Sequence, residues 1–513
     1  MRRIQFMGVV AIISLWSYGQ DSLAMRYANE ITENRIKEHL VEISSDEYEG
    51  RESGYKGQKM CEEYMVEFYK TLGLPPVKGS YVQEFELSLN DPSRVMMKQD
   101  NKEYSFLQDY FYYPGTTDRR IEAEIYYSGY GIADKKYTDI NVFDLEDKAV
   151  IIWSGEPIME GGKFKISGTN EPSTWSTNND KKRELIEDAG AKAMLIIHPD
   201  YESKAKQMGR YFSHKGMSLK SDDKKERKNM PVFHISQQMG EDLLGAKVMK
   251  KAIKARDKGK VKSIGLEKKI EIEFARRTEL LVSSNVMGYI EGGDKKDEVV
   301  IITAHYDHIG VDGEEIYNGA DDDGSGTAAT MVIAQAFAQA KEEGNGPRRS
   351  VMILNVSAEE KGLLGSRFYT ENPVLPLQST VANLNIDMIG RVDEQHDGNE
   401  NYVYLIGADR LSQDLHDVGE KVNSEYCGLE LDYTFNAEDD PNKFYYRSDH
   451  YNFAKNNVPA VFYFSGVHED YHKPGDTVDK IMFPKLTRIT KLIFHTAWDI
   501  ANREDRLRLN SQD

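Results

Sequence analysis

Short apolar runs alternate with helical patterns between residues 266 and 505. Five of these runs consist mainly of aliphatic and aromatic residues, at 299–304, 351–356, 381–386, 402–406 and 460–464. Between the first two lies an alanine-rich segment, 327–340, which has the composition of a helix. Strands that are apolar throughout are buried on both faces, so they indicate a sheet with helices on either side. We therefore predict a three-layer α/β fold for this part of the chain.

Two helices are predicted before residue 75. Apolar residues recur there at intervals of three and four, at Ile31, Ile36, Leu40 and Ile43 and then at Met60, Tyr64, Phe68 and Leu72. A glycine-containing loop that begins Glu49-Gly50-Arg51 lies between them. This loop either joins the two helices or lies at the rim of a site that later residues complete.

The pattern changes between residues 118 and 265. Two apolar runs, 149–153 and 193–197, read as buried strands around a polar helix that reaches Ala189-Gly190, and Pro231 to Ser236 follows later. The lysine-rich segment 204–228 reads as an exposed excursion because its apolar residues are sparse. The strand before Ala189-Gly190-Ala191 and the later Pro-Val-x-x-Ile-Ser resemble the protease-associated domain that is inserted in several exopeptidases.

Polar residues cluster where the predicted strands end. They lie in 305–308 after the first run, in 357–362 after the second, in 387–391 after the third and in 471–477 near the C-terminus. Such clusters mark the usual ligand crevice of an α/β sheet. Two histidines and three carboxylates from separate loops suit zinc, with cobalt or manganese as possible substitutes.

The segment Asn318 to Gly326 contains three adjacent aspartates within a glycine-flanked turn. Adjacent carboxylates repel one another unless a cation or a dense set of donors neutralises them. A solvated acidic loop is the simplest interpretation of such a run taken alone. Calcium binding of the EF-hand type fails, because placing Gly324 at the required glycine puts Gly319 at the first ligand and Thr330 at the last.

Taken together, these motifs resemble the di-zinc signature of peptidase family M28. The motifs that carry the resemblance are His305-x-Asp307, Gly319-Ala320-Asp321-Asp322-Asp323-x-Ser325-Gly326, Ala358-Glu359-Glu360-x-Gly362, Asp387-Met388 and His472, together with the earlier Glu49-Gly50-Arg51. The resemblance implies a zinc-exopeptidase sheet and two Zn²⁺ per chain. It implies that His305 and Asp387 bind one zinc, that Glu360 and His472 bind the other, and that Asp322 bridges them.

The same resemblance assigns the catalytic groups. Glu359 is expected to act as general base, and Asp307 as a carboxylate that orients the imidazole of His305. Tyr471 either donates to the oxyanion or simply packs. The family also implies a cis peptide bond between Asp322 and Asp323. Ser448-Asp449-His450 is expected to support the site and is not read as a nucleophile triad, since no Gly-x-Ser-x-Gly elbow surrounds Ser448.

Composition and the N-terminal sequence predict where the protein is located and how the chain divides into domains. The 513 residues carry a formal net charge of -19, which disfavours nucleic acid and anionic membrane surfaces as partners. Met1-Arg2-Arg3, the apolar run 4–16 and Ser17-Tyr18-Gly19 have the three regions of a secretory signal, and the apolar run is short for a membrane span. We therefore predict a signal peptide at 1–20, peptidase segments at 21–117 and 266–513, and an inserted protease-associated domain at 118–265.

The expected protein is an exported, periplasmic or extracellular, zinc aminopeptidase that acts on peptides, without a membrane anchor. Three alternatives remain open at this point: a glutamate carboxypeptidase-like peptidase, a glutaminyl cyclase with one zinc, and a non-catalytic binding ectodomain. Cys61 and Cys427 are the only cysteines, and we expect them to remain thiols, although an exported chain allows them to pair.

Overall fold

The computed structural model describes residues 21–90, 95–112, 120–159, 161–213, 216–220, 229–257, 263–274 and 279–510. The predicted signal peptide at 1–20 lies outside the described residues. The chain forms two compact units, the first made of Met1–Phe85 and Val282–Asp513 and the second of Glu86–Leu281. The second unit begins earlier and ends later in the sequence than the predicted insertion at 118–265, because strands on both sides of that range pair within its sheet.

A mixed sheet forms the centre of the first unit. Its strands run in the order β1 (Val82–Asn90), β13 (Glu279–Ile290), β17 (Arg349–Val356), β14 (Lys295–His305), β18 (Thr380–Ile386), β21 (Ala460–Phe464), β19 (Tyr402–Ile406) and β20 (Glu430–Asp432). The five apolar runs predicted as strands all lie in this sheet. β14 pairs in parallel with β17 on one side and with β18 on the other, so the carboxyl ends of these three strands lie at one edge.

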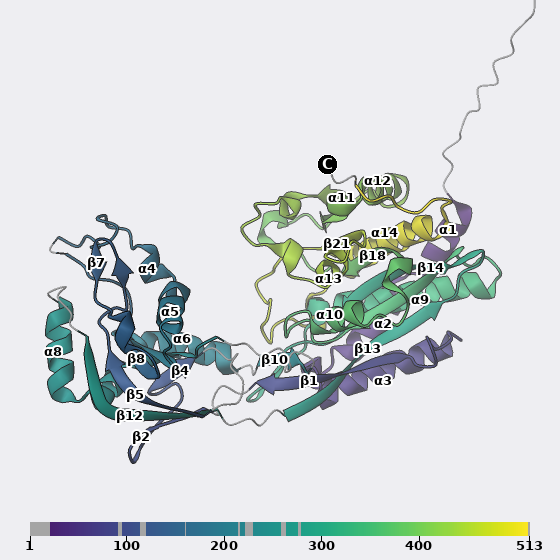
Figure 1. Ribbon diagram of the computed structural model, residues 1–513. Coiled ribbons are helices and arrows are strands. Elements are labelled where there is room, and N and C mark those ends of the chain that lie inside the picture. The colour runs from purple at the N-terminus through teal and green to yellow at the C-terminus, as the bar shows by residue number, and fades with distance from the viewer. Residues whose placement is uncertain are drawn as a thin grey trace, which may run out of the picture. The chain divides into compact units, whose positions relative to one another are not determined.

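Helices cover both faces of this sheet (Figure 1). Alternate strand residues such as Val300 and Ile302 face one core, while Ile301 between them faces the other. The first core includes α1 (Ser22–Ala28), α2 (Glu33–Ile43), α3 (Lys56–Thr71), α9 (Gly326–Glu342), α12 (Gln413–Val422) and α14 (Phe483–Asn502). The second includes α10 (Leu364–Glu371) and α13 (His450–Ala454). The predicted three-layer α/β arrangement is therefore confirmed.

The second unit is built on a separate sheet. Its strands run in the order β3 (Lys102–Tyr104), β2 (Val95–Gln99), β12 (Ile264–Phe274), β5 (Arg120–Tyr127), β8 (Lys148–Trp153), β9 (Ala193–His198), β11 (Val232–Ser236) and β4 (Tyr110–Tyr112). Its helices are α4 (Thr174–Thr177), α5 (Asn179–Asp188), α6 (Tyr201–Ser213), α7 (Gln237–Leu244) and α8 (Ala246–Asp257). Part of the lysine-rich segment thus belongs to α6. The assignment of this unit as a protease-associated domain stays a prediction.

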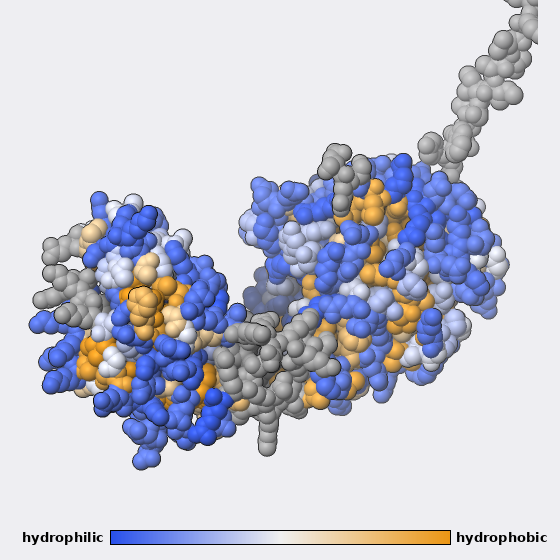
Figure 2. Space-filling view, in the orientation of Figure 1, coloured by the Kyte–Doolittle hydropathy of each residue, from blue (hydrophilic) through white to orange (hydrophobic). Residues whose placement is uncertain are grey.

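Hydrophilic residues cover much of the face of each unit that Figure 2 shows, in keeping with a content of 29% charged residues. None of the helices in the described ranges combines the length and the apolar character that a bilayer crossing requires. Cys61 and Cys427 are both free, and burial raises the pKa of each thiol to about 12. Both cysteines are therefore unreactive thiols at neutral pH.

Candidate metal centre

Parallel pairing brings the predicted site residues together. His305 is the last residue of β14, Glu359 and Glu360 follow β17, and Asp387 follows β18, so all four lie beyond the same edge of the sheet. Asp322 lies in the buried turn η5 (Ala320–Ser325) that leads into α9. The sheet thus positions residues from loops that are far apart in the sequence.

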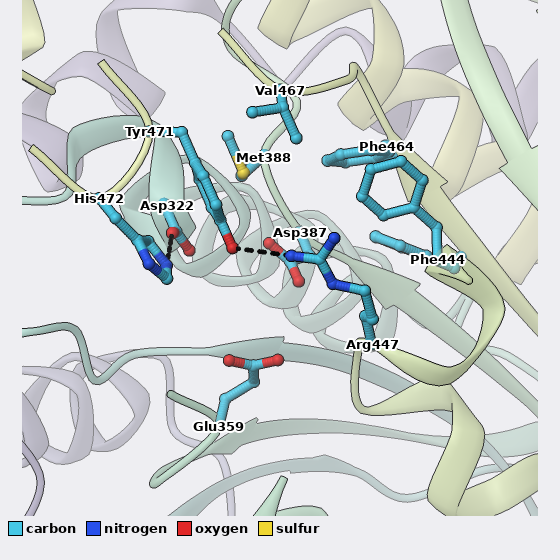
Figure 3. Close-up of a pocket in the computed structure, with 11 residues that line it drawn as sticks. Asp322, Glu359, Asp387, Met388, Phe444, Arg447, Phe464, Val467, Tyr471 and His472 are labelled. Carbon is cyan, nitrogen blue, oxygen red and sulfur yellow. Dashed lines mark hydrogen bonds and ion pairs between the residues drawn. The ribbon is translucent and has the colours of Figure 1, made fainter. Parts of the chain in front are cut away.

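Asp322 lies between the two predicted histidine ligands. Its Oδ1 is 3.2 Å from Nε2 of His305. Its Oδ2 is 3.1 Å from Nε2 of His472, a contact that Figure 3 shows. Asp387 Oδ1 lies 3.6 Å from the same nitrogen of His305, and Glu360 Oε2 lies 3.1 Å from that of His472. Each carboxylate oxygen of Asp322 therefore faces a different histidine and carboxylate pair.

Several of these atoms have no hydrogen-bond partner among the described residues. They are Nε2 of His305, Oδ2 of Asp322 and Oε1 of Glu360, and all three are buried. A buried polar atom without a partner costs about 1–3 kcal/mol, so such a convergence requires another species. Nitrogen and carboxylate oxygen donors suit zinc. The residues around Asp322 therefore fit bound zinc.

The carboxylates and the imidazoles of His305 and His472 stabilise each other's charged forms. Burial lowers the pKa of His305, but the carboxylates of Glu359 and Asp387 outweigh burial and raise that pKa well above its ordinary value. Burial raises the pKa of Asp322, yet contacts with His305 and His472 bring it well below its ordinary value. The site thus keeps Asp322 ionised, which is the state that a bridging ligand requires.

The two aspartates beside Asp322 have different partners. Both carboxylate oxygens of Asp323 accept backbone N–H groups, from His305 at 3.1 Å, Gly326 at 2.9 Å and Met388 at 3.1 Å. Oδ1 of Asp321 accepts the N–H of Gly390 at 2.6 Å. These bonds hold the turn in place. The peptide bond between Asp322 and Asp323 is cis, as the family resemblance implied.

Asp307 contacts His305 differently from the expectation. Nδ1 of His305 lies 3.0 Å from the backbone carbonyl of Asp307, whereas the carboxylate oxygen Oδ1 is 3.7 Å away. The carboxylate accepts instead from the N–H of Glu359 at 3.2 Å and from Oγ of Ser53 at 2.8 Å. The carbonyl therefore orients the imidazole, and the fully buried carboxylate links the loops that bear His305 and Glu359.

Arg51 connects three loops beneath the site. Its fully buried guanidinium donates to the carbonyls of Ile43 at 2.8 Å, Tyr306 at 2.9 Å, Asn318 at 2.7 Å and Gly319 at 2.9 Å. Tyr306 follows His305, and Gly319 precedes the aspartate turn. The Glu49-Gly50-Arg51 loop thus fixes the backbone on both sides of the site, whereas the sequence left open only whether it joins two helices or lies at the rim of a site.

A pocket opens beside Asp322 and His472 (Figure 3). Acidic side chains form one wall, and the other is lined by Met388, Phe444, Phe462, Phe464 and Val467. Tyr471 stacks on His472 with ring centroids 3.9 Å apart, and its hydroxyl lies 3.4 Å from Nη2 of Arg447. The sequence indicated Tyr471 but not Arg447 or the apolar wall, since these residues carry no spacing signal of their own.

Glu359 reaches the same pocket from the loop after β17. Oε2 of Glu359 lies 4.0 Å from Nε2 of His305. Burial raises the pKa of this carboxyl well above its ordinary value, with Asp387, Asp449 and Glu360 adding to the effect against the opposing charge of His305. A carboxyl whose pKa is raised in a pocket is a candidate for proton transfer.

Ser448 supports the site rather than forming a nucleophile. Its Oγ donates to Oδ2 of Asp387 at 2.7 Å and accepts from Nδ2 of Asn385 at 2.8 Å. The imidazole of His450 is fully buried and stacks on Phe462. The hydroxyl of Ser448 is therefore committed to fixing a candidate ligand.

Comparisons with known proteins show what this chain is similar to. The model of peptidase family M28 matches residues 285–497. Aminopeptidase NAALADL1 of Mus musculus is 37% identical over 121 residues, which are 23% of this chain and 15% of that protein. Leucine aminopeptidase 1 of Sclerotinia sclerotiorum is 28% identical over 214 residues, covering 40% of this chain and 54% of that protein.

Among solved structures, the aminopeptidase from Aneurinibacillus sp. strain AM-1 aligns over 96% of this chain and 98% of its own, with a TM-score of 0.54 and 19% identity. Because the identity is only 19%, this structural similarity establishes the fold alone. The chain therefore matches only part of the length of its curated relatives, while its fold matches a solved structure almost throughout.

Proposed function

We propose that this protein is a zinc-dependent aminopeptidase that hydrolyses the bond after the first residue of a peptide, a proposal supported by the match of residues 285–497 to the model of peptidase family M28. The observation that carries the proposal is the position of Asp322, whose two oxygens face His305 at 3.2 Å and His472 at 3.1 Å. A carboxylate shared in this way is suited to bridge two cations.

His305, Asp322 and Asp387 would hold one zinc, and Asp322, Glu360 and His472 the other. When bound, zinc supplies Lewis-acid activation of a water molecule and of the scissile carbonyl. The carbonyl of Asp307 and the hydroxyl of Ser448 fix the ligands His305 and Asp387 before substrate arrives. The protein therefore contributes a preorganised set of donors.

Glu359 would perform the proton transfers. Its carboxylate takes a proton from the attacking water as general base and returns it to the leaving amine as general acid. Burial raises the pKa of Glu359, which favours its holding the proton until the amine leaves. The hydroxyl of Tyr471 would donate a hydrogen bond to the oxygen of the tetrahedral intermediate.

The acidic wall favours a free amino terminus. Glu359 and Asp387 both line the pocket, so an ammonium group bound there is attracted to two carboxylates. The opposite wall, which contains Phe444, Phe464 and Val467, accommodates an apolar side chain next to the scissile bond. Peptides with an unblocked apolar first residue are the substrates that this arrangement suits best.

A glutamate carboxypeptidase-like activity is the second candidate, and Arg447 is the observation in its favour. This exposed guanidinium lines the same pocket and lies 4.9 Å from the ring centroid of Phe444. Arginine binds carboxylates in a bidentate manner, so it is suited to an acidic substrate group. The two candidates differ in which terminus of the substrate must be free.

Export through the predicted signal peptide at 1–20 is part of the proposal, with the mature protein acting outside the cytoplasm. The N-terminal sequence Met1-Arg2-Arg3 with its apolar run supports this location. Amino-terminal sequencing of the protein recovered from the periplasm or medium tests the point, and an uncut Met1 would contradict it.

The deciding assay compares peptides with free and acetylated amino ends and with free and amidated carboxyl ends. We expect cleavage to require the free amino end, and Glu359→Gln to abolish it while both zinc ions remain bound. Equal cleavage of acetylated peptides would refute the aminopeptidase assignment, and a requirement for the free carboxyl end would favour the second candidate. One zinc per active chain would instead favour a glutaminyl cyclase.

A further inference from the structure

His308 is a second buried histidine in the loop after β14. Its side chain is completely inaccessible to solvent, and neither ring nitrogen has a hydrogen-bond partner among the described residues. An imidazole buried without hydrogen bonds loses its hydration without full compensation. The residue lies within the motif His305-Tyr306-Asp307-His308, yet the family resemblance gives it no role.

Three unpartnered atoms converge at this position. Nδ1 of His308 is 2.8 Å from Oε1 of Glu360 and 3.8 Å from Oδ2 of Asp322, and these two oxygens also lack hydrogen-bond partners. The 2.8 Å contact does not have hydrogen-bond geometry, so it leaves both atoms unsatisfied. The three donor atoms lie within 4.8 Å of one another. A single cation between them satisfies all three.

The surrounding backbone holds the imidazole in this place. The N–H of His308 donates to the carbonyl of Arg51 at 3.2 Å. The ring lies directly against Gly319, where a β-carbon would come within 2.5 Å of Cδ2 of His308. The first glycine of the aspartate turn is therefore required for the ring of His308 to occupy its position.

We propose that His308 is a ligand of the second metal centre, together with Asp322, Glu360 and His472. This inference rests on the proposed two-metal function and extends it. The second centre then has four protein ligands, two nitrogens and two oxygens, whereas the first has the three ligands His305, Asp322 and Asp387. Closed four-ligand zinc sites are structural and three-ligand sites keep an open position, so the open position lies at the first centre, beside Glu359.

The test compares His308→Ala with His308→Asn and His308→Gln. Asparagine places its amide near the position of Nδ1, whereas glutamine reaches the position of Nε2 and leaves the Nδ1 position empty. His495→Ala is the matched control, because His495 is also buried but belongs to the helix α14, packed against Tyr426. Zinc per chain is measured after dialysis, zinc affinity by competition with a chelator, and coordination by the visible spectrum of the cobalt-substituted protein.

We expect wild type and His495→Ala to bind two zinc ions. His308→Ala and His308→Gln should keep one tightly, with affinity for the other reduced at least about ten-fold and an altered cobalt spectrum, and His308→Asn should lose less. Two ions bound with unchanged affinity in His308→Ala would overturn the inference about His308 and leave the proposed function standing. A weaker second ion with an unchanged cobalt spectrum would also overturn ligation, leaving His308 as a positioning residue. A wild type that binds fewer than two ions would overturn the proposed function itself.

Discussion

Replacing Arg51 by methionine should destabilise the first unit strongly. The guanidinium of Arg51 is fully buried, and four backbone carbonyls accept hydrogen bonds from it. One of these carbonyls belongs to Ile43, the last residue of α2, where the helix offers no internal donor. Methionine has a similar length but no donor, so the substitution leaves all four carbonyls without this partner.

The magnitude follows from the count of bonds. The carbonyl of Gly319 keeps a second partner, the N–H of Gly324 at 3.2 Å, so three carbonyls are left unsatisfied. A buried carbonyl without its partner costs about 1–3 kcal/mol, so the lower end of that range for three carbonyls gives about 3 kcal/mol. Removing the cost of burying a charge works in the opposite direction, which is why the lower end is appropriate. Arg51→Lys should fall between methionine and wild type, because lysine keeps the charge and three donors but lacks the planar fork.

The assay is urea unfolding that reports only on the first unit. Trp498 lies on α14 in the core of that unit, whereas Trp153 and Trp175 belong to the second. With Trp16, Trp153 and Trp175 replaced by phenylalanine, tryptophan emission therefore follows the unfolding of the first unit. Arg26→Met is the control, because Arg26 is 58% exposed and its ion pair with Glu343 is worth about 1 kcal/mol at most. A loss for Arg51→Met no larger than for this control would refute the reasoning.

Three further predictions concern the site and its surroundings. Gly319→Ala should lower the free energy of unfolding by more than about 1 kcal/mol and lower the zinc content, since Gly319 has φ +54° and a β-carbon would lie 2.3 Å from the carbonyl oxygen of Asp322. The control is Gly428→Ala, at φ +63° with open space around it, which should keep its zinc. Equal zinc contents in the two variants would contradict this view. Tyr471→Phe should lower kcat about 100-fold or more with little change in KM or zinc content, and an unchanged kcat would show that Tyr471 only packs. Burial lowers the pKa of His39 to about 4, so the unfolded chain takes up this proton first, and His39 contributes stability that is lost as pH falls from about 6.5 to about 4. His39→Gln should therefore reduce the loss of first-unit stability between pH 7 and pH 5, and an unchanged loss would contradict the assignment.

The sheet was predictable because its signal is local. Each apolar run that became β14, β17, β18, β19 or β21 is long enough and apolar enough to form a buried strand, whatever its neighbours are. The position of polar residues directly after those runs also follows from the sequence alone. Parallel pairing then requires that His305, Glu360 and Asp387 lie at one edge.

The boundaries of the second unit were less predictable. Strands β2, β3 and β4 at residues 95–112 belong to its sheet, although their sequence carries no sign of which sheet they join. These strands are only 3 to 5 residues long, so several pairings are compatible with their sequence. Only the tertiary structure assigns them.

The motif around Asp322 shows which features of the site the sequence predicts and which it does not. By itself, the sequence determined the kinds of donor, their order and, through the family resemblance, the choice of Asp322 among three aspartates. The tertiary structure decided that the carbonyl of Asp307 and not its carboxylate orients His305, that Arg51 holds the aspartate turn, and that His308 faces Glu360. The physical reason is range: strands and turns follow from neighbouring residues, whereas the direction of a side chain depends on groups that are distant in sequence and brought together only by folding.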